Sequence, residues 1–397
     1  MLTEHSNPFD KSVEPFLPYG RQTVSEADIA AVRGVLASEF LTQGPTIPRF
    51  EEEVARFVGA HYAVAANSAT SALHMACMAL GLRDGDRLWT SPTSFVASAN
   101  CGRYCGAIVD FVDIDPKDGL MSAERLSEKL ERAAIEKTLP KIIIPVHLCG
   151  SSCDMERISA LAKIYGIKVI EDASHAIGGA YRESRVGSCI YSDITIFSFH
   201  PVKIITSGEG GMAVTNDSEV AERLRDLRSH GITKDPDRYM FCSKPWQYEQ
   251  HTLGFNYRMT DIQAALGLSQ LGRLEERVEA RNKLFREYEL QTRGLPIRLL
   301  KANEMVLSSY HLAVARLHNG SESLHERVFR GLRGKGIGVQ VHYSPIHLQP
   351  YYRELGFKEG DFPEAEAYEK NAISLPLFPG MNEEDIIRVC SALKSVL

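Results

Sequence analysis

The sequence has no apolar run long enough to cross a membrane and no concentrated block of positive charge. Its longest apolar runs, such as KIIIPV at 141–146, are far shorter than the roughly 20 residues that a membrane-spanning helix needs. The 45 lysines and arginines are outnumbered by 51 aspartates and glutamates, which gives a formal charge of −6. Since a nucleic acid requires a concentrated cationic face, the composition indicates neither a membrane nor a nucleic-acid partner.

A secretion signal is also missing from the first 20 residues, MLTEHSNPFDKSVEPFLPYG. This segment is polar, is interrupted by prolines and contains no apolar core of signal-peptide length. We therefore expect a cytoplasmic protein. The 397 residues, 44% of them hydrophobic, are enough for a sizeable core and for two or three domains.

The cysteines indicate neither a disulfide framework nor a metal site. They are scattered through a long chain that has no secretion signal. The spacing C-x3-C occurs at 101–105 and at 149–153, but no His-x3-His pair accompanies it, so we expect no metal and assign the thiols to buried or loop positions. The eight cysteines are Cys77, Cys101, Cys105, Cys149, Cys153, Cys189, Cys242 and Cys390.

Short β-branched segments alternate with helical patterns over the first half of the chain. This alternation predicts a mostly parallel sheet with helices on both faces, and ligands in such folds bind at the carboxyl ends of the strands. The predicted strands are 62–67, 87–92, 108–114, 141–147, 167–172, 193–199 and 211–216, and the predicted helices are 71–81, 122–137, 154–166 and 218–231.

A second, smaller α/β domain is expected in the C-terminal part. Residues 260–289 read as one long amphipathic helix that connects the two domains. Beyond it, the predicted strands are 308–317 and 338–345, and the predicted helices are 324–336 and 383–397. We divide the chain into a large domain with an N-terminal arm, residues 1–270, and a small domain, residues 271–397.

The motif EDASHAIGG at 171–179 places Asp172 at the carboxyl end of a predicted strand. One interpretation is an ordinary helix N-cap with an exposed carboxylate. The other is a buried carboxylate that pairs with a cationic ring nitrogen.

Lys203 follows the next strand and is surrounded in sequence by Phe and Ile residues. A lysine at a strand end usually reaches water. An apolar environment would instead lower the pKa of its amine and suit it to Schiff-base formation. The following GEGG, 208–211, allows a sharp backbone turn beside a ligand.

Two further segments fit the same ligand. In ANSATSALHMA, 66–76, small hydroxylated residues follow a strand and open a helix, an arrangement that suits a phosphate as well as plain N-capping by Ser68 or Thr70. Phe95 follows another strand and fits either the core or the face of a flat ring. A phosphate cup, a stacking aromatic, an acid and a Schiff-base lysine come in the order expected for a pyridoxal phosphate enzyme.

With these motifs the sequence resembles the DegT/DnrJ/EryC1/StrS family of sugar aminotransferases, which are fold-type I pyridoxal phosphate enzymes. The resemblance extends from LPYGRQTVSEADIAAV at 17–32 to the C-terminal helix. The segments FSFHPVK, GFNYRMTDIQAALG and HYSPIHLQPYY are most similar to the aminotransferases of pseudaminic acid biosynthesis, which act on a UDP-linked 4-keto-6-deoxy-N-acetylhexosamine.

The resemblance implies a role for individual residues. Lys203 forms the Schiff base with the cofactor and transfers protons, Asp172 keeps the pyridine nitrogen protonated, and His175 lies at the phenolic oxygen. Phe95 stacks on the ring. The implied phosphate ligands are Ala69, Thr70, Ser198 and, from the partner subunit of a homodimer with shared active sites, Asn256, with Arg258 beside it. His342 and Tyr343 are expected to approach the substrate.

The resemblance also implies two substrates, L-glutamate and a nucleotide sugar, and a pyridoxamine phosphate form of the cofactor between the two half-reactions. Other nucleotide sugars, including those of bacillosamine-type, perosamine or 4-amino-arabinose synthesis, remain open, as do a non-catalytic regulator and a sugar dehydratase. The presence of Lys203 argues against the last two, because such relatives lack a lysine there. Within the loop 233–252, Trp246 and Tyr248 are candidates for nucleotide stacking, and an exposed aromatic loop is the alternative.

Overall fold

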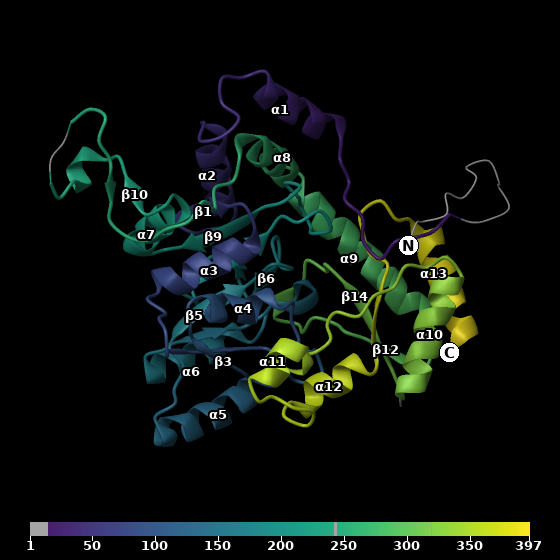
Figure 1. Cartoon of the computed structure of the whole chain (residues 1–397). Coiled ribbons are helices and arrows are strands. Elements are labelled where there is room, and N and C mark those ends of the chain that lie inside the picture. The colour runs from purple at the N-terminus through teal and green to yellow at the C-terminus, as the bar shows by residue number, and fades with distance from the viewer. Residues whose placement is uncertain (1–14, 242–243, 319) are drawn as a thin grey trace.

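A computed structural model describes residues 15–241, 244–318 and 320–397 (Figure 1). Most of the segment that was searched for a secretion signal, residues 1–14, lies outside the described residues, as does Cys242. Among the described helices, none is both long enough and apolar enough to cross a membrane.

The core of the molecule is a seven-stranded sheet, and all seven strands predicted from the sequence belong to it. Its order is β1-β9-β8-β5-β4-β2-β3, and only β9 runs antiparallel to its neighbours. The mostly parallel sheet is therefore confirmed. The strands are β1 (Tyr62–Ala66), β2 (Arg87–Thr90), β3 (Ile108–Phe111), β4 (Ile142–Ile144), β5 (Lys168–Asp172), β8 (Ile194–Ser198) and β9 (Gly211–Thr215).

Helices cover both faces of this sheet, because successive side chains of a strand point to opposite faces. In β1, Val64 and Ala66 belong to one hydrophobic core, whereas Ala63 and Ala65 belong to another that is shared with α2 and α8. The helices of this part are α1 (Glu26–Leu36), α2 (Thr46–Val58), α3 (Ala69–Ala79), α4 (Ala97–Tyr104), α5 (Ala123–Glu136), α6 (Met155–Tyr165), α7 (Ser218–Arg228) and α8 (Asp261–Leu271).

The prediction of one long helix over 260–289 is wrong. The chain forms α8 and a separate α9 (Leu274–Gln291), and Arg273 between them leaves helical geometry with φ −120°. Tertiary contacts explain the break, because the guanidinium of Arg273 lies 2.5 Å from the buried carboxylate of Asp28 in α1. Gly272, a poor helix former, lowers the cost of changing direction at this point.

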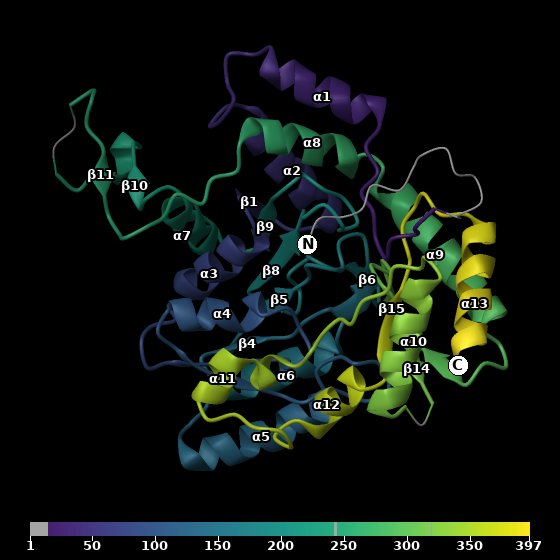
Figure 2. The same cartoon turned by 45° about the vertical axis from the view of Figure 1, so that its right-hand side comes forward.

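The C-terminal part contains a three-stranded antiparallel sheet, flanked by α9, α10 (Glu322–Gly334) and α13 (Glu383–Val396) (Figure 2). Its strands are β12 (Ile297–Leu299), β14 (Ala313–Leu317) and β15 (Ala372–Leu375). The predicted strand 308–317 is thus shortened to β14. The predicted strand 338–345 is wrong. This segment makes one isolated bridge, from Gln340 to Ser374, and its next residues line the cavity described below.

The short helices α11 (Pro350–Glu354) and α12 (Pro363–Glu369) return to the large sheet, where the ring of Tyr352 lies 5.7 Å from that of Phe111. The division into residues 1–270 and 271–397 remains a prediction. The remaining short strands form a ribbon of β6 (Ala180–Tyr181), β7 (Ser184–Arg185) and β13 (Val306–Leu307), and a hairpin of β10 (Ile232–Thr233) and β11 (Glu249–Gln250).

Candidate active site

A cavity of about 300 Å³ lies at the carboxyl ends of the central strands and brings most of the predicted site residues together. The ends of the strands and the loops that follow them contribute Asp172, Lys203 and Phe95. The C-terminal part contributes His342 and Tyr343. The predicted residues that line it are Ala69, Thr70, Phe95, Asp172, His175, Ser198, Lys203, His342 and Tyr343. Parallel strands that end at one edge explain why residues distant in sequence meet here.

Lys203 lies in the turn that follows β8 and is partly buried, so it is not a surface lysine. Its backbone N–H donates to the carbonyl of His200 at 2.9 Å, which holds the turn. Burial lowers the pKa of its ammonium to about 8, and the charge of Asp172 opposes this shift. Roughly a tenth of the amine is therefore unprotonated, and nucleophilic, at pH 7, far more than for an ordinary lysine.

Asp172 ends β5 as a buried carboxylate with 5% exposure, and no helix follows it, so the N-cap interpretation is wrong. The hydroxyl of Ser98 donates to its Oδ2 at 2.6 Å, and the hydroxyl and N–H of Ser174 donate to its Oδ1 at 2.6 and 3.1 Å. These three donors fix the orientation of the carboxylate at the cavity wall. Such a group fits a cationic ring nitrogen.

His175 is buried, and its tautomer follows from its neighbours. The backbone N–H of Cys149 donates to Nδ1 at 3.3 Å, so the ring proton lies on Nε2, which is 3.2 Å from the hydroxyl of Tyr343. Cys149 adopts a left-handed conformation, φ +61°, that allows this contact. Burial, together with the charges of Lys203 and His342, holds the pKa of His175 well below its ordinary value, so the ring is neutral.

The N-terminus of α3 faces the cavity and is suited to an anion. Ser68 caps the helix by accepting the N–H of Ser71 at 3.1 Å, and Ala69 and Thr70 follow in the first turn, where N–H groups lack intrahelical partners. A Cβ at Gly211 would lie 2.5 Å from the backbone of Ser68 and Ala69. The last glycine of GEGG is thus required by close packing, whereas Gly208 adopts the expected positive φ of +84°.

The aromatic and C-terminal residues complete the wall. Phe95 is 58% exposed and lines the cavity, so it is not a core residue. The ring of Tyr343 lies 6.2 Å from that of Phe95. The Nδ1 of His342 lies 2.8 Å from the hydroxyl of Ser374, and burial, together with the charge of Lys203, lowers the pKa of His342 to about 3.

Asn256 and Arg258 do not line the cavity of their own chain. They flank Tyr257, whose carbonyl accepts the N–H of Asn67 at 2.8 Å at the end of β1. Asn256 is exposed, and within the described residues Arg258 has no hydrogen bond or ion pair. The role predicted for them at a partner's cofactor stays a prediction.

The loop 233–252 forms part of the β10–β11 hairpin, which projects away from the body of the chain in both views (Figures 1 and 2). Trp246 is 76% exposed and Tyr248 is 58% exposed, and neither lines the cavity. Nucleotide stacking by these residues within one chain is therefore not supported.

Sequence reasoning missed several residues of the site. Ser98 does not line the cavity, but its buried hydroxyl orients Asp172, a contact that no local pattern predicts. His311 lines the cavity with its ring 4.3 Å from that of His175, and its buried Nδ1 has no hydrogen-bond partner among the described residues. Tyr19 reaches the cavity from the N-terminal arm, which no local pattern predicts.

The donor set fits pyridoxal phosphate. Within the described chain, Lys203 is the only lysine or arginine that lines the cavity, Asp172 is oriented by three hydrogen bonds, and the N-terminus of α3 offers N–H groups to a phosphate. These residues could hold the aldehyde carbon, the ring nitrogen and the phosphate of the cofactor, respectively. No group of three or more His, Cys, Asp or Glu side chains suited to a metal occurs among the described residues. The fold and this site define a fold-type I pyridoxal phosphate-dependent aminotransferase.

Comparisons with known proteins agree with this class. A model of the DegT/DnrJ/EryC1/StrS aminotransferase family matches residues 22–394. The chain belongs to this family, as the sequence resemblance predicted.

Two curated relatives match over nearly their full length. The UDP-4-amino-4,6-dideoxy-N-acetyl-beta-L-altrosamine transaminase of Campylobacter jejuni is 37% identical over 382 residues, 96% of this chain and 97% of the relative. The spore coat polysaccharide biosynthesis protein SpsC of Bacillus subtilis is 36% identical over 386 residues, with 96% and 97% covered.

Two solved structures are similar throughout. The sugar aminotransferase Spr1654 of Streptococcus pneumoniae in its PLP-form gives a TM-score of 0.87 at 29% identity, covering 96% of this chain and 98% of that chain, and it is also known in a PMP-form. Helicobacter pylori PseC, an aminotransferase of pseudaminic acid biosynthesis, gives 0.87 at 31% identity, with 96% and 99% covered. The fold class is confirmed, and so, for this family, is the predicted cofactor in both forms.

Proposed function

We propose that this protein transfers an amino group from L-glutamate to C4 of a UDP-linked 4-keto-6-deoxy-N-acetylhexosamine, giving UDP-4-amino-4,6-dideoxy-N-acetyl-beta-L-altrosamine. The observation that carries the aminotransferase chemistry is the amine of Lys203 in the same cavity as the oriented carboxylate of Asp172. The substrate rests on the sequence motifs and on the likeness to the Campylobacter jejuni and Helicobacter pylori enzymes.

The chain's own residues have distinct tasks in this reaction. Bound pyridoxal phosphate supplies an electron sink at the reacting carbon. Nζ of Lys203 takes the proton from the α-carbon of L-glutamate and, in the second half-reaction, delivers a proton to C4 of the sugar. The carboxylate of Asp172 keeps the ring nitrogen protonated, and His175 lies at the phenolic oxygen.

The remaining residues bind and orient the ligands. Phe95 stacks on the ring, and Ala69, Thr70 and Ser198 hold the phosphate through N–H and hydroxyl donors. His342 and Tyr343, which line the opposite wall, approach the substrate. Their neutral side chains suit hydroxyl and keto groups of a sugar.

A spectroscopic experiment tests the substrate. L-Glutamate converts the enzyme to its pyridoxamine form and bleaches the yellow band, and excess glutamate is then removed. The two C5 epimers of the UDP-4-keto-6-deoxy-N-acetylhexosamine are added separately. Return of the band with the L-arabino epimer alone supports the proposal, whereas return with the D-xylo epimer alone assigns the bacillosamine-type route. Failure with both, after normal bleaching, points to another nucleotide sugar.

We also propose that the active form is a homodimer in which Asn256 and Arg258 reach the phosphate end of the partner's cofactor. Within one chain, both residues lie outside the cavity although they border the strand that leads to its phosphate-binding turn. Large apolar side chains before, on and after α1 are exposed, which favours burial against a second copy. These are Val24, Ile29, Leu36, Phe40 and Leu41.

Mixing two inactive variants tests the shared site. Lys203→Ala and Asn256→Ala subunits are unfolded together and refolded, so that a heterodimer contains one site with both residues intact. If sites are shared, the mixture recovers about a quarter of the wild-type activity. If Asn256 serves its own subunit, no site in the mixture regains both residues, and activity stays at the level of the separate variants.

A further inference from the structure

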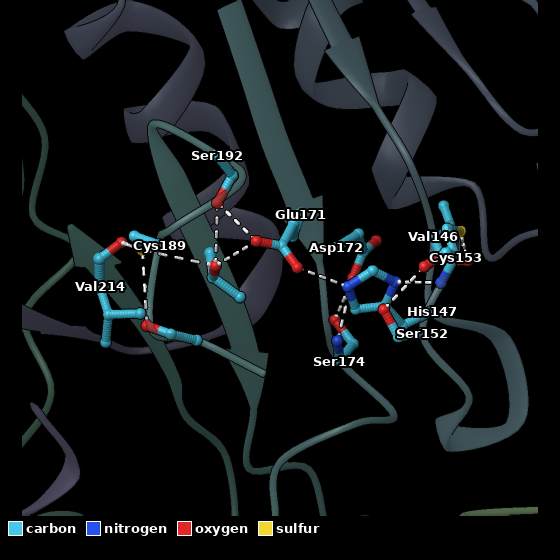
Figure 3. Close-up of polar contacts among 12 residues, drawn as sticks. Val146, His147, Ser152, Cys153, Glu171, Asp172, Ser174, Cys189, Ser192 and Val214 are labelled. Atoms are coloured by element: carbon cyan, nitrogen blue, oxygen red, sulfur yellow. Dashed lines mark hydrogen bonds and ion pairs between the residues drawn. The ribbon is translucent and has the colours of Figure 1, made fainter. Parts of the chain in front are cut away.

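A second buried carboxylate, that of Glu171, lies next to Asp172 in the central sheet. Glu171 precedes Asp172 in β5, and because side chains alternate along a strand, the two carboxylates lie on opposite faces of the sheet. Glu171 is 5% exposed, and Figure 3 shows it between Ser192 on one side and His147 on the other. The cavity does not include it, so it cannot contact a ligand.

Three donors hold this carboxylate. Nε2 of His147 lies 2.7 Å from its Oε2, and the hydroxyls of Ser192 and Thr195 donate to its Oε1 at 2.5 and 3.1 Å. These three hydrogen bonds stabilise the ionised carboxylate of Glu171 in spite of its burial. Glu171 is therefore ionised at neutral pH.

His147 does not neutralise this charge. The backbone N–H of Cys153 donates to its Nδ1 at 3.2 Å, so Nδ1 carries no proton, and the single ring proton lies on Nε2 toward Glu171 (Figure 3). An imidazolium would need a proton on both nitrogens. The pair consequently carries a net charge of minus one.

Within the described chain, no lysine, arginine or second histidine forms an ion pair with Glu171, so its charge is not compensated there. The thiols of Cys153 and Cys189 face the same region, and burial raises the pKa of each, with the charge of Glu171 adding to the effect, so both stay protonated. A buried carboxylate without a positively charged partner destabilises the folded protein. A positive charge on a bound ligand nearby would offset this effect.

The pair is also connected to the backbone of the site. The N–H of His147 donates to the carbonyl of Asp172 at 3.0 Å, and the N–H of Asp172 donates to the carbonyl of Pro145 at 2.9 Å. The segment that starts at His147 then supplies Cys149, whose N–H fixes the tautomer of His175. Because the ring of His147 also accepts the N–H of Cys153, His147 holds both ends of this loop. The loop in turn positions Asp172 and His175, two of the proposed cofactor contacts.

We propose that Glu171, held by His147, is a positioning residue for Asp172, which lies on the opposite face of the sheet. Its carboxylate adds a second negative charge that stabilises the positively charged ring of the bound cofactor. This inference rests on the proposed role of Asp172. Neither residue reacts. Glu171 acts through the electrostatic field across the sheet, and His147 acts by keeping that carboxylate ionised and in place.

The charge state is tested in the wild-type protein by ¹⁵N NMR of its histidine rings near neutral pH, with a His147→Gln variant used only to assign the signal. We expect the pattern of a neutral ring protonated at Nε2. A signal typical of an imidazolium would overturn the proposal, since the pair would then carry no net charge. The charge state is read from the wild-type protein, and this measurement does not depend on cofactor loading.

The effect on the cofactor is tested with Glu171→Gln, and the chain offers a matched control. His347 and Glu366 form another buried pair, with 3.0 Å between Nε2 and Oε1, and neither lines the cavity. Glu366→Gln removes the same kind of hydrogen-bonded carboxylate away from the site. Both variants are expected to lower the melting temperature.

Only Glu171→Gln should change the spectrum of the bound cofactor. Loss of a nearby negative charge disfavours the protonated chromophore, so the pH midpoint of its visible band should fall by roughly half a unit to one unit. Glu171→Asp keeps the charge and should keep the midpoint while losing stability. A midpoint in Glu171→Gln equal to that of wild type would refute the proposal. Absence of any cofactor band in the wild type would instead refute the proposed function.

Discussion

The hydroxyl of Tyr343 lies 3.2 Å from Nε2 of His175, although 168 residues separate them in sequence. Since the N–H of Cys149 occupies Nδ1, the ring proton of His175 is on Nε2 and is donated to the oxygen of Tyr343. The hydrogen of the Tyr343 hydroxyl is then left to point into the cavity. Burial raises the pKa of Tyr343, so this hydrogen is retained at all physiological pH values.

Replacing Tyr343 by Phe should remove one donor to the ligand and leave the cavity shape intact. We expect the activity with the keto sugar to fall by roughly tenfold, the loss of about one hydrogen bond. Steady-state kinetics with each substrate measure this effect. Unchanged kinetics would show that Tyr343 does not contact the reacting ligands.

Changing Asp172 to Asn should lower the transamination rate by several orders of magnitude, because an amide does not hold a proton on the ring nitrogen. Ser174→Ala is the control, since it retains the carboxylate and removes only the hydroxyl donor at 2.6 Å. That control should lose about tenfold or less. Near-normal turnover by Asp172→Asn would contradict the assignment.

The depressed pKa of Lys203 predicts a specific pH dependence of apoenzyme stability. Its folded pKa of about 8 is below the ordinary lysine value of 10.5, so the unfolded state binds more protons between these values. The free energy of unfolding therefore rises as pH increases from about 8 to 10.5. Below about pH 8, the full destabilising effect of the buried Lys203 ammonium is present.

Lys203→Met removes that penalty. The apo-variant should be more stable than wild type by up to about 3 kcal/mol at pH 7, and this difference should shrink toward pH 10. Urea unfolding of both apo-proteins across this pH range measures the difference, and a Met substitution at the exposed Lys335 serves as the reference. A pH-independent difference would place Lys203 in a solvated environment.

Gly211→Ala should weaken cofactor binding through packing alone. The added Cβ would meet the backbone of Ser68 and Ala69 at 2.5 Å and displace the first turn of α3. We expect a stability loss of about 1–3 kcal/mol and a clear loss of pyridoxal phosphate affinity in an apoenzyme titration. Gly34→Ala, where a Cβ would meet nothing within 4 Å, should leave the affinity unchanged and should raise stability by about 0.5–1 kcal/mol, because Gly34 lies within helix α1. Normal affinity in Gly211→Ala would show that this turn does not hold the phosphate.

The sequence by itself predicted the seven central strands, the helices α3, α5, α6 and α7, and the candidate residues Lys203, Asp172 and Phe95. These follow from local patterns, because each predicted strand ends where a parallel sheet collects its ligands. Hydrophobic periodicity likewise predicted helix 383–397, which the structure shows as α13. Such features depend on residues that are close together in the chain.

Only the tertiary structure decided the features that depend on distant contacts. The break before α9 follows from the pairing of Arg273 with Asp28, and the segment 338–345 leaves the small sheet because its side chains line the cavity. The proton positions on His147 and His175 are set by backbone N–H groups of one loop. No periodicity encodes these contacts, since they exist only once the loop has folded against the sheet.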